Sequence, residues 1–407
     1  MPSEAGMMAV QSILNSFNIT TVTEIILLII IYNNFLKRRD IMKFYCDTQK
    51  LCDAIGIVSK AVAVKSPVPH LEGILLSAKG GKLTLTANNL EISIKTSVSA
   101  NVSEEGKIVL NSKMLSDIVR KLPQDVCEII SNDKNNVSIN CLNADYKIVG
   151  LSADEFPQPP EIEAESKIKI KSSDLKEIIG KTLFAVSVDN TRKIFTGSLF
   201  EIENNVLNVV AIDGYRLALI HHVLEGENNN AKFIIPGKTQ AELAKILSGS
   251  DESVISIFFS KNYALIEGEN IVFTSRLIEG EFFAYKNTIP KESKHIIKTE
   301  TRAFLKAIER VEPIIDEVSK NCVRMTFGGG KILIKCETVL GKVNDSVECD
   351  YYEEDMEIGF NYRYLHDAVS RCDGDELEMR VNSPINPMIL QNPEDESFLY
   401  LVLPVRI

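Results

Sequence analysis

The sequence has no tryptophan, only five histidines among 407 residues, and no cysteines spaced as CxxC. Zinc sites use cysteine and histidine at short spacings, so no metal site is expected. The eight cysteines are scattered, mostly through apolar stretches, which favours buried free thiols. Reduced thiols are typical of cytoplasmic proteins, and we predict a cytoplasmic location.

Catalytic signatures are also missing. There is no P-loop, nucleophile elbow or dinucleotide fingerprint. The run Asp213–Arg216 resembles a catalytic turn, and the acidic run Glu353–Asp355 resembles a metal cluster. A nuclease, however, needs several carboxylates gathered in one pocket, whereas short acidic runs such as Glu394–Glu396 are more often solvated loops. We therefore predict a non-catalytic protein without a cofactor, and an enzyme is the alternative.

The apolar run near the N-terminus, Ile25–Tyr32, is well short of the roughly 20 residues that a membrane helix needs. Its basic residues, Lys37–Arg39, follow the run, whereas those of a signal peptide precede it. We predict no membrane association and place residues 1–41 outside the fold, as an N-terminal extension. A short membrane-associating helix is the alternative.

One pattern occurs three times along the chain. An apolar strand end leads to a turn residue, then to a basic residue two positions later and a helical pattern. The turn residues Asn111, Pro236 and Asn361 are about 125 residues apart. A fixed period of this length indicates three copies of one domain.

Proline-containing crossings separate the copies. Phe156–Glu161 lies between the first and second copies, and Ile289–Ser293 lies between the second and third. We predict domains at residues 42–160, 161–288 and 289–407.

The apolar pattern of each copy predicts a strand, a helix and three strands, and then the same order again. This order indicates an α+β fold with two helices on antiparallel sheets. The six predicted helices are Asp47–Val62, Ser112–Leu122, Ser173–Ser187, Gly237–Leu247, Thr301–Ile315 and Tyr362–Arg371. Asp47, Ser173 and Thr301 are N-cap residue types. Hairpin turns are predicted at Gly80–Gly81, Asn204–Asn205 and Gly328–Gly330.

Several of these helices have a basic face opposite an apolar one. The net charge of −11 means that the protein as a whole should repel nucleic acid, so any DNA-binding surface must be sorted spatially. A polar face is normal for one surface helix, but a basic bias on several helices favours sequence-independent phosphate binding. The absence of tryptophan and the few aromatics on these faces argue against single-strand stacking. The candidate DNA-facing residues are Lys113, Arg120, Lys238, Lys245, Arg302, Lys306 and Arg310.

Four segments carry a resemblance to a known family. They are Thr191–Gly197, Ile212–Ala218, Ser275–Phe282 with its continuation through Tyr285 to Pro290, and Leu403–Ile407. From Met42 onward the sequence resembles the bacterial DNA sliding clamps, the beta subunits of DNA polymerase III. The resemblance implies three tandem DNA-clamp domains and a head-to-tail homodimer that forms a six-domain ring around duplex DNA. It also implies a non-catalytic processivity factor that tethers the replicative polymerase.

The resemblance further implies a peptide-binding groove between the second and third domains. The groove would bind the DNA polymerase III catalytic subunit, the clamp loader, and other polymerases and repair proteins through short peptides. The matching positions are Phe195, Ile212, Gly214, Tyr215, Arg216, Leu217, Pro290, Leu401, Leu403, Pro404, Val405 and Arg406. Because Leu403 and Val405 stand where relatives often have methionine, and Ile212 where threonine is common, we expect a narrower or stiffer pocket.

Two further surfaces follow from the resemblance. Lys65 and Arg192 would contact DNA from loops at the mouth of the ring. The ring would close where an edge strand meets an edge strand. The matching residues are Tyr146 and Ile148 on one subunit, and Ile314 and Ile315 on the other. A scaffold that binds peptides without forming a ring is the alternative.

Overall fold

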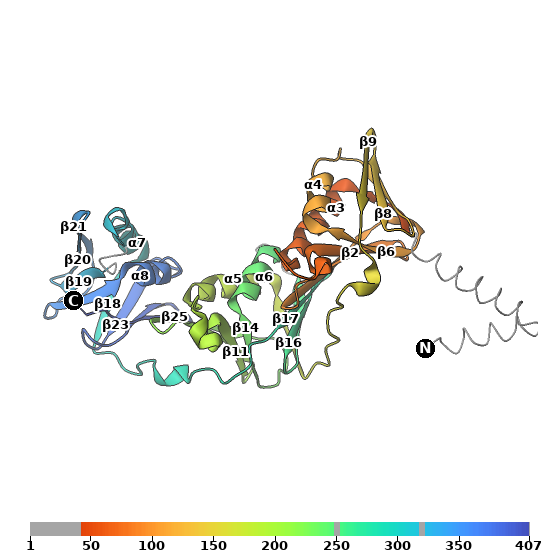
Figure 1. Cartoon of the computed structure of the whole chain (residues 1–407). Coiled ribbons are helices and arrows are strands. Elements are labelled where there is room, and N and C mark those ends of the chain that lie inside the picture. Colours follow the sequence, from red (N-terminus) through yellow and green to blue (C-terminus); the bar gives the residue numbers. More distant parts are fainter. Residues whose placement is uncertain (1–41, 248–252, 317–321, 407) are drawn as a thin grey trace, which may run out of the picture. The chain divides into compact units, whose positions relative to one another are not determined.

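The computed structural model describes residues 42–247, 253–316 and 322–406. These residues divide into two compact units (Figure 1). Unit 1 holds residues 42–89 and 93–159, and unit 2 holds residues 90–92 and 160–406. The predictions for residues 1–41 and for Ile407 lie outside the described residues.

Unit 1 contains two helices and two antiparallel sheets. Its elements are β1 (Met42–Asp47), α3 (Thr48–Val58), β2 (Gly73–Lys79), β3 (Lys82–Asn88), β4 (Ile92–Ser99), β5 (Asn101–Glu104), β6 (Gly106–Asn111), α4 (Ser112–Val119), β7 (Val126–Ser131), β8 (Asn136–Cys141) and β9 (Ala144–Val149). One sheet has the order β5-β1-β7-β8-β9, and β4-β3-β2-β6 are neighbours in another. The helices pack against each other through a core that includes Leu51, Ile55 and Leu115. Strand β9 is the edge of its sheet.

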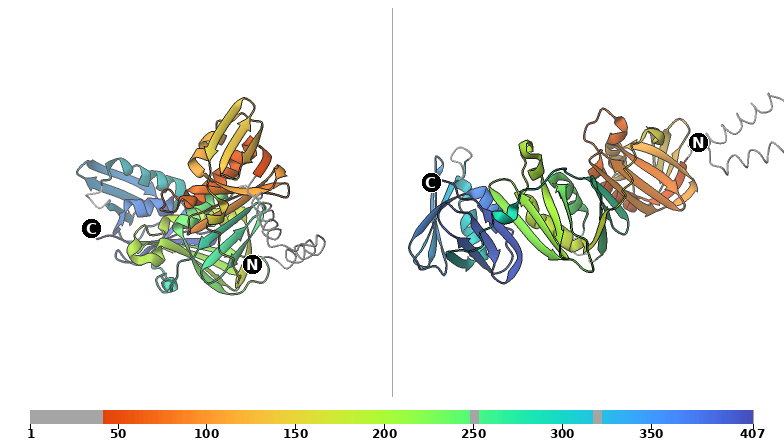
Figure 2. Two further views of the ribbon diagram at one scale, coloured as in Figure 1. Left: turned by 45° about the vertical axis from the view of Figure 1, so that its right-hand side comes forward. Right: turned by 90° about the horizontal axis from the view of Figure 1, so that it is seen from below.

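Unit 2 contains two further copies of this arrangement, whose antiparallel strands can be followed in Figure 2. The elements of the first are β10 (Ser166–Lys171), α5 (Ser172–Thr182), β11 (Gly197–Glu203), β12 (Val206–Ile212), β13 (Arg216–Val223), β14 (Ala231–Pro236), α6 (Gly237–Ile246), β15 (Val254–Phe259), β16 (Tyr263–Glu267) and β17 (Ile271–Arg276). Those of the second are β18 (His295–Glu300), α7 (Thr301–Glu309), β19 (Cys322–Gly328), β20 (Lys331–Thr338), β21 (Gly341–Glu348), β22 (Met356–Asn361), α8 (Tyr362–Val369), β23 (Glu376–Val381), β24 (Met388–Asn392) and β25 (Asp395–Val402). The predicted order of strands and helices is therefore confirmed, with β5 as an additional strand.

An eight-stranded sheet joins the two copies of unit 2. Its order is β14-β11-β12-β13-β25-β24-β23-β18, so each copy contributes four strands. The joint is the antiparallel pair β13–β25, in which Leu217 lies opposite Leu401. The C-terminal strand therefore ends beside the turn between β12 and β13.

The three predicted hairpin turns are confirmed, because both central residues of each have positive φ. The values are 58° and 75° at Gly80 and Gly81, 52° and 63° at Asn204 and Asn205, and 57° and 76° at Gly329 and Gly330. Two successive residues of positive φ are typical of type I′ turns, which match the twist of the flanking strands. Glycine and asparagine adopt this conformation at little cost.

The first residues of the helices confirm one predicted N-cap and show that two others were wrong. Asp47 caps α3 as expected, because its carboxylate accepts a hydrogen bond from the Lys50 N–H at 2.9 Å. Ser173 and Thr301 are not caps, since α5 and α7 begin at Ser172 and Thr301, after Lys171 and Glu300. The Thr301 N–H instead donates to the Asp375 carbonyl at 2.8 Å. The equivalent Thr48 N–H donates to the Asp125 carbonyl at 3.0 Å, so all three helices begin directly after a strand, with the same backbone bond at the first helical residue.

The predicted helix ends were too late. Helix α3 ends at Val58 and continues as a 3₁₀ turn, Ser59–Ala61. Helix α7 ends at Glu309 and is followed by the 3₁₀ turn Glu312–Ile314, so Ile315 is not helical. A 3₁₀ turn continues the apolar spacing of a helix for a few residues, which explains the longer predicted ranges.

All eight cysteines are free thiols, as predicted. Cys46, Cys127, Cys141 and Cys336 are buried, and the other four are half-buried. Burial raises the pKa of the Cys46 thiol to about 11 and that of the Cys127 thiol to about 12. These thiols are therefore protonated at neutral pH.

Candidate functional site

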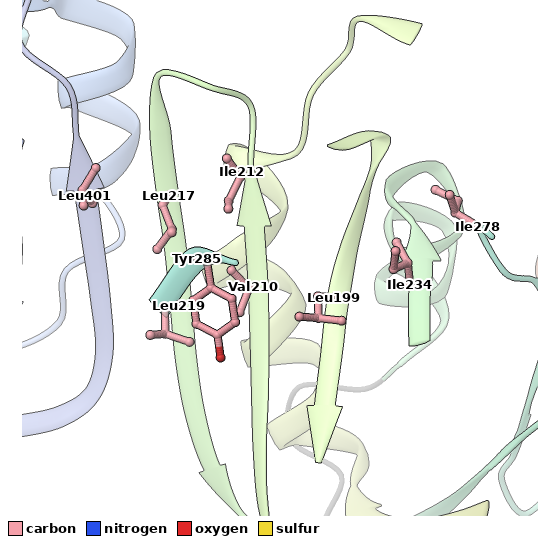
Figure 3. Close-up of a cluster of buried hydrophobic side chains, with 9 residues drawn as sticks. All are labelled: Leu199, Val210, Ile212, Leu217, Leu219, Ile234, Ile278, Tyr285 and Leu401. Carbon is pink, nitrogen blue, oxygen red and sulfur yellow. The ribbon is translucent and has the colours of Figure 1, made fainter. Parts of the chain in front are cut away.

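An apolar cluster occupies the joint between the two copies of unit 2, and we call it the joint cluster. Its buried members are Leu199, Val210, Ile212, Leu217, Leu219, Ile234, Ile278, Tyr285 and Leu401 (Figure 3). Half-buried side chains packed against it are Ile194, Phe195, Phe282, Ile289, Leu399 and Leu403. The structure thus brings together five of the predicted groove residues, namely Phe195, Ile212, Leu217, Leu401 and Leu403.

Strand alternation explains why these side chains share one face. Leu217 and Leu219 are two residues apart on β13, as are Val210 and Ile212 on β12, so each pair points to the same side of the sheet. Leu401 continues this face onto β25, directly opposite Leu217. The result is an apolar surface that continues from one copy into the next.

The margin of the joint cluster is accessible. Phe195 and Leu403 are half-buried, and the side chain of Tyr215, in the β12–β13 turn, is 57% exposed. Positive φ at Gly214 (96°) forms this turn, and the Asp213 carboxylate accepts a hydrogen bond from the Tyr215 N–H at 2.9 Å. The turn therefore holds an aromatic side chain at the edge of an apolar surface, an arrangement that suits anchoring an apolar peptide side chain.

Arg216 fixes the polar rim of this surface. Its guanidinium lies 2.9 Å from the Asp213 carboxylate and 2.5 Å from the carboxylate of Asp367 on α8. It also lies 4.7 Å from the centre of the Tyr364 ring, which stacks on the Tyr215 ring at 5.5 Å. Because one guanidinium pairs with two carboxylates and also stacks on a ring, the Arg216 side chain is held in place, and the three charged groups together carry a net charge of −1.

The C-terminal tail is held at the same place. The Leu403 N–H donates to the Tyr215 carbonyl at 2.9 Å, and the Val405 N–H donates to the Gly359 carbonyl at 2.8 Å. Leu403, Pro404 and Val405 are half-buried, and Arg406 is exposed. Pro290, also half-buried, follows Ile289, which packs on the joint cluster.

A buried carboxylate anchors the crossing segment that follows β17. Glu201 on β11 is 2% exposed and accepts a hydrogen bond from the Tyr285 hydroxyl at 2.6 Å. The ammonium groups of Lys232 and Lys286 lie 2.6 Å and 3.0 Å from it. Burial alone would raise the pKa of Glu201, but these three donors lower it below its usual value. Glu201 is thus ionised at neutral pH and ties the crossing segment to the sheet.

Sequence reasoning missed part of this site. Leu199, Val210 and Leu219 follow the alternation of their strands, a signal that was available in the sequence. Tyr364 and Asp367 gave no such signal, because they are ordinary helix residues about 150 positions from Arg216 in the chain. Helix α8 packs against β25, and the pairing of β25 with β13 brings it to the rim.

The predicted DNA-facing residues are exposed on their helices or in loops. Lys113 lies on α4, Lys238 and Lys245 on α6, and Arg302 and Lys306 on α7. Arg120 and Arg310 are the C-cap residues of α4 and α7. Lys65 lies in an exposed loop, and Arg192 is exposed within the 3₁₀ segment Asn190–Thr196, where its own backbone is not helical.

Two of these cations are already paired within the chain. Lys245 lies 2.7 Å from Glu242, and Arg310 pairs with Asp345 on β21. A cation that is neutralised by its own chain gains less from a phosphate. Lys245 and Arg310 are therefore weaker candidates for DNA contact than the other residues of the set.

The predicted subunit-contact residues lie at two separate places. Tyr146 and Ile148 are half-buried on the edge strand β9, as expected. Ile314 and Ile315 are half-buried, but they lie in and just after a 3₁₀ turn rather than on a strand. The nearby four-stranded sheet has the order β21-β20-β19-β22, and its edge strand β21 contacts this turn. A strand-to-strand contact would therefore use β21, with the two isoleucines beside it.

Within the described ranges, no group of three or more His, Cys, Asp or Glu side chains could hold a metal ion. Among the helices of that same part of the chain, none is both long and apolar enough to cross a membrane.

Three family models match the chain in tandem. They are the N-terminal, central and C-terminal domains of the DNA polymerase III beta subunit, at residues 42–160, 169–283 and 286–406. The chain belongs to the bacterial sliding-clamp family, the beta subunits of DNA polymerase III. Like other members of this family, it is a non-catalytic processivity factor built from three tandem clamp domains.

Individual relatives support the same family assignment. The beta sliding clamp of Bacillus subtilis is 32% identical over 377 residues, covering 90% of this chain and 100% of the relative. That of Halalkalibacterium halodurans is 33% identical over 379 residues, with the same coverage of both chains. The solved structure of the B. subtilis DNA polymerase sliding clamp superposes with a TM-score of 0.87 at 31% identity, covering 90% of this chain and 99% of that one. The predicted family and fold class are confirmed.

Proposed function

We propose that two copies of this chain close head to tail into a ring around duplex DNA, and that the margin of the joint cluster is the groove that binds partner peptides. The observation that carries the proposal is the apolar surface shared by β13 and β25, with an exposed tyrosine and a fixed polar rim beside it. Replication in bacteria takes place in the cytoplasm, where we place the protein.

The groove suits short peptides with apolar anchors. Phe195, Leu217 and Leu403 offer an apolar floor, and Arg216 and Tyr215 offer a rim with hydrogen-bonding groups. Burying one or two aliphatic or aromatic side chains there would supply most of the binding energy, as at other interfaces. We propose as partners the catalytic subunit of DNA polymerase III, the clamp loader, and other polymerases and repair proteins.

The DNA surface would be loose and independent of sequence. Exposed cations recur on α4, α6 and α7, and phosphates are the same at every base pair. Contacts of this kind weaken as salt increases, which suits a ring that slides. Lys65, Arg192, Lys113, Arg120, Lys238, Arg302 and Lys306 form the preferred set, with Lys245 and Arg310 as weaker members.

Retention on DNA tests the ring. The clamp, loaded onto circular DNA, should stay bound through gel filtration and should be released once the circle is cut. A protein that stays equally well on cut DNA does not encircle it. The alternative, a scaffold that binds peptides without a ring, predicts no retention on either form.

Removal of residues 403–407 tests the groove. The shortened chain should lose binding to a polymerase-derived peptide, measured by fluorescence polarisation, because Leu403 packs on the joint cluster. It should remain a dimer, since the proposed subunit contacts involve Tyr146, Ile148, Ile314 and Ile315. Loss of the dimer with intact peptide binding would contradict the assignment.

We also keep domain boundaries at residues 42–160, 161–288 and 289–407, with residues 1–41 as an extension outside the ring. A chain that begins at Met42 should then dimerise and unfold like the full chain. A large drop in its melting temperature would contradict this assignment.

A further inference from the structure

A large hollow in unit 2 borders the strand β14, and we call it the β14 hollow (β14 is labelled in Figure 1). Its volume is ≈ 1130 Å³, whereas pockets for small ligands measure about 300–1,000 Å³. Its lining includes Phe233 on β14 and Phe259 on β15, whose rings stack on each other. A space of this size with an apolar lining suits an extended chain segment better than a compact small molecule.

Strand β14 presents an unpaired edge to this hollow. It is the first strand in the order of its sheet and pairs with β11 on its other side. The Ile234 carbonyl accepts a hydrogen bond from the Ile278 N–H at 2.9 Å, so this carbonyl points away from β11. Because backbone groups two residues apart point the same way, the N–H and carbonyl of Lys232 also face away from β11. No backbone group of a described residue bonds to them, and such an edge accepts an added strand.

The hollow is continuous with the proposed peptide groove. At the surface, Phe283 lines the hollow and is 48% exposed, and its ring lies 6.4 Å from that of Phe195 at the margin of the joint cluster. Four members of the joint cluster also line the hollow, namely Leu199, Ile234, Ile278 and Tyr285. A peptide anchored in the groove therefore reaches the hollow across the two phenylalanine rings.

The free charges that line the hollow are mainly negative. Glu165, Glu279 and Glu281 are exposed, and none of the three forms an ion pair with a residue that the structure describes. Two of the three lining lysines already pair with carboxylates on β11, which leaves Lys261 as the free ammonium group of this lining. Three free carboxylates against one free ammonium group favour a positively charged segment.

The crossing segment holds two of these carboxylates, Glu279 and Glu281, in a fixed bend. Gly280 between them has a φ of 134°, which favours glycine, and a Cβ there would lie 3.1 Å from the Ile194 side chain. The backbone bond to β14 before this bend and the hydroxyl bond to the buried carboxylate after it fasten the segment on both sides. The two carboxylates are thus part of a preformed surface.

We propose that a basic, extended segment of the partner peptide, next to its apolar anchors, binds in the β14 hollow. The segment adds a strand along β14, and its lysine or arginine side chains pair with Glu279 and Glu281. This inference rests on the groove proposed above and adds a second chemical requirement, which is positive charge beside the apolar anchors. Apolar burial in the groove supplies most of the affinity, and charge in the hollow selects among partners.

Peptides of two lengths test the inference by fluorescence polarisation. The short probe is a polymerase-derived peptide that carries the apolar anchors, and two long probes carry four additional lysines at one end or at the other. One long probe should bind about 5-fold more tightly than the short probe at low salt, the ratio that two exposed ion pairs give. The gain should shrink as salt is added. Equal affinity of all three probes would overturn the inference.

Charge reversal locates the contact. In the double variant Glu279→Lys, Glu281→Lys, the gain from the lysine extension should disappear, and an extension of four glutamates should increase the affinity instead. The matched control is Glu269→Lys, which makes the same change of charge at an exposed residue of the β16–β17 turn, outside the hollow. It should keep the gain of the original chain. If the control loses as much of the gain as either charge reversal, the effect reflects net charge alone and the inference is wrong.

Pairing along β14 has a test of its own. A long probe with N-methylated amides in its extension keeps the lysine charges and lacks the backbone donors. It should lose most of the gain, because its side chains are no longer aligned along the strand. If it binds as tightly as the unmodified long probe, no strand is added to β14 and the inference is overturned.

The short probe separates this inference from the proposed groove. If the short probe does not bind the original chain, the groove itself fails. If it binds, and binding is lost on removal of residues 403–407, the groove stands. The absence of any gain from either lysine extension in that case overturns only the β14 hollow.

Discussion

Replacement of Tyr285 by phenylalanine should destabilise unit 2 without disturbing its apolar packing. The ring of Tyr285 belongs to the joint cluster, and its hydroxyl donates to the Glu201 carboxylate at 2.6 Å. Phenylalanine keeps the ring and removes the donor. Glu201 is 2% exposed, so water cannot replace the lost hydrogen bond without a rearrangement of the crossing segment.

The expected cost is about 1.5–3 kcal/mol, the usual contribution of a hydrogen bond to a charged group. Lys232 and Lys286 still neutralise Glu201 in the variant, at 2.6 Å and 3.0 Å, which keeps the loss below that of an unpaired buried charge. Urea unfolding, followed by circular dichroism at neutral pH, would measure the difference. A suitable control is Tyr263→Phe, because the Tyr263 hydroxyl makes no hydrogen bond to any residue that the structure describes.

The pH dependence of the free energy of unfolding gives a second, independent test of the hydrogen bond between Tyr285 and Glu201. The folded pKa of Glu201 is lowered, so its interactions stabilise the fold above the unfolded value of about 4.3. This stabilisation is lost as the pH falls through the lower folded pKa. Tyr285→Phe raises the folded pKa of Glu201 towards the unfolded one. The difference in free energy of unfolding between the original chain and the variant should therefore narrow below about pH 4. If Tyr285→Phe is as stable as the original chain at pH 7, the hydrogen bond to Glu201 contributes no stability. A difference in free energy of unfolding that stays constant at acid pH would show that the effect does not depend on ionised Glu201.

Three further predictions concern other sites. Arg216→Lys should weaken binding of a polymerase peptide about 10-fold in fluorescence polarisation, because lysine cannot form both carboxylate contacts and the ring stacking; unchanged affinity would remove the residue from the groove. Hydrogen bonding, led by the Tyr45 hydroxyl, lowers the pKa of Glu128 to about 2, so unit 1 should lose stability from about pH 4.3 down to pH 2, and Tyr45→Phe should flatten this loss in thermal melts. The buried thiols of Cys46 and Cys127 should not react with Ellman's reagent at pH 8 in the folded protein but should react quickly in urea; fast labelling of the folded chain would contradict their burial.

Local sequence determined the repeating plan of this protein. Each hairpin turn depends on two adjacent residues that tolerate positive φ, such as Gly80–Gly81 or Asn204–Asn205, and neighbouring residues alone specify such a turn. Strand and helix periods are equally local, which is why the order of elements was predictable. The resemblance then assigned Phe195, Leu217 and Leu403 to a common surface, and the structure brings them together.

Pairing between strands that are far apart in the chain determined the features that local sequence did not. Ser173 and Thr301 have the right chemistry for caps, but the preceding strands end at Lys171 and Glu300, and these residues hold the cap positions. The pairing of β13 with β25 brings Asp367 to Arg216 from about 150 residues away. No local pattern encodes such a partner, because the register of two distant strands depends on the whole sheet.

The sequence by itself therefore determined three copies of one domain with basic helix faces, since periodicity and turn chemistry act over a few residues. Only the tertiary structure decided how the second and third copies meet, which carboxylates hold Arg216, and how Glu201 fastens the crossing segment. These features depend on burial and on contacts between distant residues, and both arise only once the sheet has formed.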